Sequence, residues 1–510
     1  MRNDAPAQTT PSGARDRMRA SAHPVFAEQI LNPIFEFNCR NFFAPLLAAH
    51  RAWLTMLVER GIVKSKPAKA IFKGLEDLEV AGPDAVRPFD PAVEYYYLHM
   101  ERALVALVPG GEGVVGDLNL GRTRPEPLAR MVIREKLLDV LKHVLDVREA
   151  LLGRGETEAA TVMPGYTHLQ HAQPTTLGHY CLAVHDHLER DTERLLQALD
   201  VTDRCTLGCG AMSGTSLPID RERVRELLGF GALCENTIDS VSASDHVTST
   251  AAALAGVMMI VGRLCQDLYV WSSLEFAMID VTDEFSSPSS LMPQKKNALV
   301  LEYLRSRTAR TIGYLAGCFT VLHNVGYMDT EEVELECCLP MFDCFTSVEQ
   351  TLPTICQVVR SMEPNRERMY SRAEQGFSSV TALAEQIQST RQISYRSAHR
   401  VVARAVLLAV EENKTATEID ADLLNRAAQD TIGRHLTLDN ASIEACLNPG
   451  TFVRSHKATG GASPAEVRRM ADDRRSRLKS DRERIDARGQ AIRDGEAMLA
   501  EAVAGIMATA

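Results

Sequence analysis

Three polar segments of the 510-residue chain combine residue types that could transfer protons and hold anions. The first ends a glycine-rich stretch with Gly121-Arg122-Thr123-Arg124, and guanidinium groups pair with carboxylates in bidentate geometry. The second, residues 164–174, gathers Thr, His and Gln side chains that can exchange hydrogen bonds with a small ligand. The third, residues 286–297, joins four serines to two lysines and an Asn. A lysine close to a serine hydroxyl can activate it or stabilise an oxyanion.

Each segment also has an ordinary structural interpretation when it is taken alone. The arginines could form ion pairs on a surface loop, the His-containing segment could be a capped turn, and the serines could belong to a flexible linker. The acidic run from Asp329 to Glu336 is typical of a solvated helix start, although a role toward substrate stays open. Only the combination of the segments favours chemistry over these alternatives.

Two further patterns do not predict cofactor sites. Gly111, Gly113 and Gly116 spell GxGxxG, but a dinucleotide site needs a preceding buried strand, and the residues before Pro109 have a helical pattern. His179 and His187 share one face of a predicted helix without Cys or a cage of acidic residues, so we expect a satisfied helix surface and no metal.

Long helices must position these segments. Apolar residues recur every three to four positions from Pro125 to Gly153, which predicts a helix of about 25 residues and roughly 38 Å. Further helices are expected over 177–203, 242–278, 298–322, 333–358 with an interruption at Pro340, and 465–507, with a loop over 161–176. The fold class is therefore all-α. Helices this long and apolar need partners, which indicates an oligomeric bundle. The predicted parts are a tail (1–23), an N-terminal helical domain (24–121), a central long-helix bundle (122–368) and a C-terminal helical domain (369–510).

Composition excludes several functional classes. The formal net charge is −11, which argues against nucleic acid or anionic membrane surfaces as partners. The longest apolar run, Ala251 to Gly262, is shorter than the roughly 18–20 residues that cross a bilayer, and the first 23 residues contain no apolar signal block. The 12 cysteines show no CxxC or metal-ligand spacing, which is typical of reduced thiols and predicts a cytoplasmic protein.

The order of GRTR, then PGYTHLQ-x-AQP, then SSLMPQKKN resembles the fumarase/aspartase superfamily, and within it argininosuccinate lyase. Further similar stretches are residues 207–222 (LGCGAMSGTSLPIDRE), LEFAMIDVTDEFSS before the serine loop, and TGGASPAEV. The resemblance implies a three-part all-α subunit and a homotetramer in which loops of three subunits build each active site. It also implies anti-elimination from a succinyl group, giving fumarate and an amine, without metal or organic cofactor.

The resemblance assigns roles to matching residues. Ser289 would be the base, acting as its alkoxide, while Lys295 and Asn297 would bind a carboxylate and stabilise the developing charge. His168, with Thr167, would assist protonation of the leaving nitrogen.

Departures from the family pattern fall mainly at ligand-binding positions. Arg124, expected to bind a succinyl carboxylate, is followed by Pro125-Glu126-Pro127 in place of the family's Asn-Asp-Gln. A binding Ser of the family falls at Arg40, which we expect to replace a lost donor to the succinate.

The family's Tyr, Gln and Lys, which hold the amino-acid end of argininosuccinate, align with Tyr327, Glu332 and Leu335. Loss of the Lys and gain of Glu332 suggest a leaving amine that is less anionic or more cationic.

Three functional interpretations follow. The first is a carbon–nitrogen lyase acting on an N-substituted aspartate other than argininosuccinate, or adding an amine to fumarate. The second is a true argininosuccinate lyase with a diverged pocket. The third is a catalytically silent homologue kept as a structural or partner-binding protein.

Overall fold

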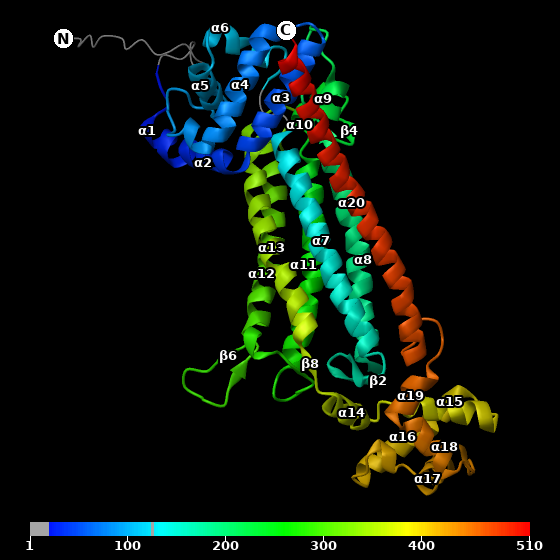
Figure 1. Cartoon of the computed structure of the whole chain (residues 1–510). Helices are drawn as coiled ribbons and strands as arrows, with labels where there is room; N and C mark the ends of the chain where they lie inside the picture. Colours follow the sequence, from blue (N-terminus) through cyan, green and yellow to red (C-terminus); the bar gives the residue numbers. More distant parts are fainter. Residues whose placement is uncertain (1–19, 124–126, 510) are drawn as a thin grey trace.

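The computed structural model describes residues 20–123 and 127–509 and confirms the all-α fold (Figure 1). Arg124, Pro125 and Glu126 lie outside the described residues. A long bundle occupies the middle of the molecule, and shorter helices cluster at its two ends. The bundle contains α7 (Leu128–Thr157), α8 (Leu177–Thr202), α11 (Asp245–Trp271), α12 (Leu299–Leu322) and α13 (Cys338–Ser361).

The upper cluster in Figure 1 holds the N-terminal helices together with two short helices from the middle of the chain. These are α1 (Pro24–Phe26), α2 (Asn32–Asn41), α3 (Phe43–Glu59), α4 (Ser65–Ala81), α5 (Tyr96–Leu107), α6 (Glu112–Val115), α9 (Arg221–Leu227) and α10 (Thr237–Ser242). The lower cluster consists of α14 (Arg366–Glu374), α15 (Val380–Arg391), α16 (Tyr395–Glu411), α17 (Ala421–Ile432), α18 (Asn440–Leu447) and α19 (Pro449–Ser455).

The predicted long helices are present, with two corrections. The single helix expected over 242–278 is two helices, α10 and α11, because Ala243 is extended (φ −73°, ψ 123°). The second helix also ends at Trp271, where the hydroxyls of Ser272 and Ser273 donate to the carbonyls of Tyr269 and Val270. The segment expected over 333–358 is a π-helix over Glu332–Glu336 followed by α13 from Cys338, so the predicted interruption falls at Cys337, three residues before Pro340.

The C-terminal helix α20 (Pro464–Ala508) returns along the whole bundle to the upper cluster (Figure 1). It packs on α7 and α8 and then on α3, α4 and α9. Arg148 of α7 is fully buried and donates to the carboxylate of Asp481 of α20 at 2.7 Å. Residues 383–447 form a separate apolar core of their own, so the predicted unit 369–510 contains this small core and the returning helix.

Helix α11 is apolar on most of its surface. By length and composition alone it could cross a membrane, and 56% of its most apolar 18-residue window is buried inside this chain. It packs against α8, α12 and α13, as the core helix of a bundle must. Its apolarity is therefore used, at least in large part, for packing within the subunit.

Candidate active site

The residues singled out by sequence lie at opposite ends of the bundle (Figure 1). The His-containing and Ser-containing segments are both at the lower end, in the hairpins β1–β2 and β6–β7. Arg122 precedes α7 at the upper end, and the acidic run follows α12 there.

Residues 161–176 are not the loop expected but a hairpin, β1 (Val162–Thr167) and β2 (Gln170–Thr176). Thr167 pairs with Gln170, which leaves His168 and Leu169 as the two turn residues, with φ of 55° and 57°. Two consecutive positive φ values are the signature of a type I′ turn. Non-glycine residues adopt this conformation at a cost, and such strain concentrates at functional sites. The turn exposes His168 at the tip of the hairpin.

The serine segment is also a hairpin, with β6 (Ser287–Pro288) antiparallel to β7 (Lys296–Asn297). The backbone N–H of Ser289 donates to the carbonyl of Lys295 at 3.2 Å, which closes the loop between them. The Oγ of Ser289 accepts hydrogen bonds from the N–H groups of Leu291 at 3.3 Å and Met292 at 3.0 Å. Two N–H donors directed at one oxygen favour negative charge on that oxygen.

The two adjacent lysines have different environments. The Nζ of Lys296 lies 2.8 Å from carboxylate oxygens of both Asp280 and Asp283, and these two carboxylates raise the pKa of Lys296. Lys295 is exposed, and its ammonium makes no ion pair with any residue that the structure describes. Of the two, Lys295 is therefore the one available to a ligand. Asn297 is half-buried, and its amide donates to the carbonyl of Ser287 at 3.3 Å.

Within one chain, the residues at the lower end of the bundle do not meet those at the upper end. Helix α7 alone has 30 residues, about 45 Å at 1.5 Å per residue. The Ser289 hairpin and Arg122 lie at opposite ends of a bundle of this length (Figure 1). Side chains cannot span that distance, so a site that uses both ends has to combine different chains.

At the upper end, Arg122 is held by neutral partners. Its guanidinium donates to Asn119 Oδ1 at 2.9 and 3.1 Å, and its Nη2 lies 2.6 Å from Nδ1 of His50. Burial first, and then the charge of Arg122, hold the pKa of His50 well below its usual value, so the imidazole stays neutral and accepts. Among described residues no carboxylate forms an ion pair with Arg122, although its charge acts on the carboxyl of Glu101, and its Nη1 is buried without a hydrogen-bond partner. Such a guanidinium is suited to bind a substrate carboxylate.

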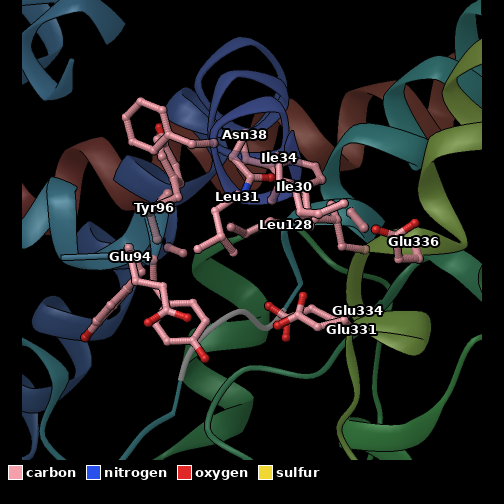
Figure 2. A pocket seen from close by; sticks show the side chains of 18 of the residues that line it. Ile30, Leu31, Ile34, Asn38, Glu94, Tyr96, Leu128, Glu331, Glu334 and Glu336 are labelled. Carbon is pink, nitrogen blue, oxygen red and sulfur yellow. The ribbon is translucent and has the colours of Figure 1, made fainter. Parts of the chain in front are cut away.

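A cavity of about 390 Å³ adjoins Arg122 (Figure 2). Asn38, Ile34, Ile30 and Leu31 lie on one side of it, and Glu331 and Glu334 lie together on the opposite side. Other lining residues come from separate parts of the chain: Tyr96, Leu128, Leu335 and Glu336. The cavity therefore combines apolar walls with a group of carboxylates.

The remaining predicted binding residues lie outside the lining of this cavity. Arg40 is exposed, and its Nε donates to the carbonyl of Glu36 on the same helix at 3.1 Å. Tyr327 is 85% exposed. Glu332 is exposed too, and hydrogen bonds with Thr330 and with the backbone lower the pKa of its carboxyl. Arg124 cannot be placed because it lies outside the described residues.

One group of potential metal ligands occurs on α8 among the described residues: His185, Asp186 and Glu189. Arginines already occupy it, since Arg474 donates to both oxygens of Asp186 and Arg477 lies 2.7 Å from Glu189. This arrangement is that of an ion-pair network between α8 and α20.

Sequence analysis did not find the roles of Asn38 and Tyr96 in the cavity, and it treated Arg122 only as part of a motif. The pairing of Arg122 with His50 joins residues 72 positions apart, which no local pattern indicates. The GRTR motif contains both Arg122 and Arg124, and only Arg124 was predicted to bind a carboxylate.

The chain is similar to lyases over most of its length. A family model described as Lyase matches residues 52–313, and one described as Argininosuccinate lyase C-terminal matches residues 377–454. The argininosuccinate lyase of Methanocaldococcus jannaschii is 33% identical over 447 residues, 86% of this chain and 90% of that protein. Argininosuccinate lyase 1 of Shouchella clausii is 28% identical over 483 residues, 94% of this chain and 96% of that protein.

Among solved structures, a variant of EDDS lyase with bound fumarate superposes with a TM-score of 0.85 at 30% identity. The superposition covers 98% of this chain and 99% of that chain. The similarity thus extends over both hairpins and over the upper cluster.

Proposed function

The chain belongs to the argininosuccinate lyase family of the fumarase/aspartase superfamily and is a carbon–nitrogen lyase, and from that premise we propose that it acts on an N-substituted aspartate other than argininosuccinate. The products are fumarate and an amine, or the same reaction runs in reverse as addition of an amine to fumarate. No metal or organic cofactor takes part in the proposed reaction.

In the proposed mechanism, the Oγ of Ser289 acts as an alkoxide and removes a proton from the carbon next to a carboxylate. The electron pair of that C–H bond forms the C=C bond of fumarate, and the pair of the C–N bond leaves with the nitrogen. The leaving nitrogen takes a proton, with His168 assisting. The observation that carries the assignment is the pair of N–H groups, from Leu291 and Met292, that meet the Oγ of Ser289 and favour its anion.

Charge develops on the carboxylate next to the carbon that loses its proton, so the site needs cationic and amide donors there. We assign these roles to Lys295, whose ammonium is available, and to Asn297 on the same hairpin. Thr167 lies beside His168 and completes the lower group. Arg122, whose Nη1 lacks a partner, is a second anchor for a substrate carboxylate, alongside the sequence-based candidates Arg124 and Arg40.

Residues at the upper end of the bundle support a substrate other than argininosuccinate. Leu335, which occupies the place of the family's lysine, is 4% exposed and lines the cavity. An apolar side chain there cannot pair with the carboxylate of an amino-acid leaving group. Glu332 and Tyr327 are exposed in the single chain, so any contact they make with substrate requires a partner subunit or a movement of their segment.

We further propose a homotetramer with shared active sites. Two observations support it: the two functional ends are separated by the length of the bundle, and apolar side chains remain exposed along α11 and α12. Met259 is 54% exposed, Ile312 50% and Phe319 48%, which leaves a bundle face suited to helices of other subunits. A cytoplasmic location is proposed from the 12 free thiols, all but one of which are buried.

The deciding experiment compares fumarate release from argininosuccinate with release from a panel of other N-substituted aspartates. We expect turnover of one or more panel members and little or none of argininosuccinate. Turnover of argininosuccinate at ordinary enzyme rates would establish the second candidate, a genuine argininosuccinate lyase, which the identity to curated argininosuccinate lyases favours. Failure of every compound, in both directions, would contradict a lyase function and leave the silent homologue.

A further inference from the structure

The tip of the hairpin that carries His168 is exposed and strained. Its four residues, Thr167, His168, Leu169 and Gln170, are all exposed, and the two in the turn have positive φ angles. A strained turn keeps one conformation only where the surrounding structure over-determines it. Because the tip itself is exposed, this support has to come from the residues directly below it.

Tyr166 and His171 are the half-buried residues directly below the tip. They pair across the two strands, and their rings meet edge to face with centroids 5.4 Å apart. The ring of Tyr166 also lies 5.8 Å from that of Phe276, and its hydroxyl donates to Sδ of the buried Met278 at 3.8 Å. These contacts hold one strand of the hairpin against the segment that follows α11.

The other strand is held by a contact between His171 and Gly376, which follows α14. A side-chain carbon at Gly376 would lie 2.3 Å from Nδ1 and 3.0 Å from Cβ of His171, closer than non-bonded atoms approach. Gly376 does not have a positive φ, so the close approach of the imidazole is what requires a glycine here. Burial, and then the charge of Arg372, lower the pKa of His171, which favours a neutral ring against this backbone.

Both supports belong to one structural unit at the lower end of the bundle. Arg368 of α14 donates to the carbonyl of Phe276 at 3.3 Å, and Arg372 donates to the carbonyl of the residue before it. The N–H of Asn365, which caps α14, donates to the carbonyl of Met278 at 2.8 Å. The hairpin packs on α14 (Figure 1), so α14 and the two segments beside it hold the hairpin from two sides.

We propose that His171 and Gly376 are positioning residues, and that through them α14 sets the place of His168 in the reaction. The inference rests on the proposed function, in which His168 assists protonation of the leaving nitrogen. An alanine at Gly376 displaces the imidazole, for which a hollow of about 490 Å³ beside it has room, and the second strand loses its support. Lys295 lies on the other hairpin and still binds the carboxylate, so the loss falls on kcat and leaves KM nearly unchanged.

Single variants test the proposal on the N-substituted aspartate that the unmodified enzyme turns over fastest. His171→Ala and Gly376→Ala are each expected to lower kcat for fumarate release about tenfold, because small misplacements of a reacting group are costly. His171→Phe keeps a ring against Gly376 and retains most of the activity. Gly505→Ala, at an exposed glycine of α20 with open space around it, is the matched control and changes neither kcat nor KM.

Double variants decide whether the effect passes through His168. In the His168→Ala background, whose remaining turnover is measured at high enzyme concentration, adding Gly376→Ala is expected to cause no further loss, because the residue that it misplaces is gone. Losses that multiply would overturn the proposal and leave the lyase function intact. Unchanged kcat in both single variants, or equal losses in His171→Phe and His171→Ala, would overturn it too.

Two further points keep the outcome unambiguous. If Gly376→Ala folds poorly, the comparison of His171→Ala with His171→Phe, each alone and in the His168→Ala background, gives the answer by itself. An unmodified enzyme that releases fumarate from no N-substituted aspartate would instead contradict the proposed function.

Discussion

The Oγ of Ser289 accepts a hydrogen bond from the backbone N–H of Met292 at 3.0 Å, three residues farther along the same loop. The same oxygen accepts from Leu291, so the turn itself supplies two donors to the group that we propose as the base. Because a general base typically contributes about 10²–10⁴-fold, Ser289→Ala is expected to reduce kcat for fumarate release by that factor. Ser290→Ala, at the next and exposed position, is the control and keeps near-normal turnover. Equal activity of the two variants would contradict the assignment.

We expect the two adjacent lysines to have different roles: Lys295 stabilises developing charge, and Lys296 holds the loop. Lys295→Met is expected to lower kcat/KM about 10²–10³-fold, the cost of removing one donor that is directed at developing charge. Lys296→Met breaks the exposed contacts with Asp280 and Asp283, and exposed ion pairs of this kind contribute little to stability. Steady-state kinetics and thermal unfolding of both variants check the division. A larger kinetic loss in Lys296→Met would reverse it.

We expect activity to depend on the forked guanidinium group of Arg122 and not on its charge alone. A lysine keeps the charge but cannot donate at once to Asn119, His50 and a ligand carboxylate, so Arg122→Lys lowers kcat/KM by roughly 10- to 100-fold. Arg102→Lys, at an exposed arginine that pairs with Asp90, is the control and changes little. The loss should appear in the affinity for fumarate as well, measured by product inhibition. Unchanged inhibition by fumarate would place its carboxylates elsewhere.

Shared active sites predict complementation between inactive variants. Ser289→Ala damages the lower end of the subunit and Arg122→Gln the upper end, so a mixed tetramer contains some sites with neither defect. Unfolding and refolding the two variants together is expected to restore part of the activity, whereas Ser289→Ala refolded alone stays inactive. Size-exclusion chromatography with light scattering supplies the oligomeric state. Absence of recovery from verified mixed tetramers would show that each chain builds its own site.

Acid lability is expected from His50, whose pKa burial and Arg122 hold well below its usual value. The unfolded chain takes up a proton at this residue below pH ~6.5, and the folded chain does not. The stabilisation is therefore complete above pH ~6.5 and is lost as the pH falls, by about 1.4 kcal/mol for each pH unit. His50→Gln is expected to flatten this slope in denaturant titrations, while the exposed His435→Gln leaves it as it was. An unaltered slope in His50→Gln would show that the imidazole is charged in the folded chain.

The long helices could be predicted because their apolar residues repeat locally, as from Leu128 to Leu152. The hairpin that carries His168 could not, since its turn contains no glycine or asparagine and its strands contain Pro164 and Pro174. Its pairing depends on backbone register, which single-residue preferences do not encode. The break between α10 and α11 at Ala243 could not be predicted either. Alanine is a strong helix former, and only the fold holds it extended there.

The lower group of site residues followed from motifs, because Ser289, Lys295 and Asn297 are neighbours in one short hairpin. The cavity could not be foreseen in that way. Its polar atoms come from α2, α5 and the loop before α7, and only tertiary packing brings them to one space. Tyr327 and Arg40 were selected by alignment with a family pattern, and they are exposed in the single chain.

The course of α20 sets an order of events during synthesis. This helix contributes the last packing surface of α3 and α4, and Lys69 of α4 donates to the carbonyl of Thr509, next to the final residue. Chains are made and fold from the N-terminal end first, so α3 and α4 leave the ribosome before the α20 segment on which they pack. The packing of these first helices therefore waits for α20, and we expect it to be completed late in synthesis.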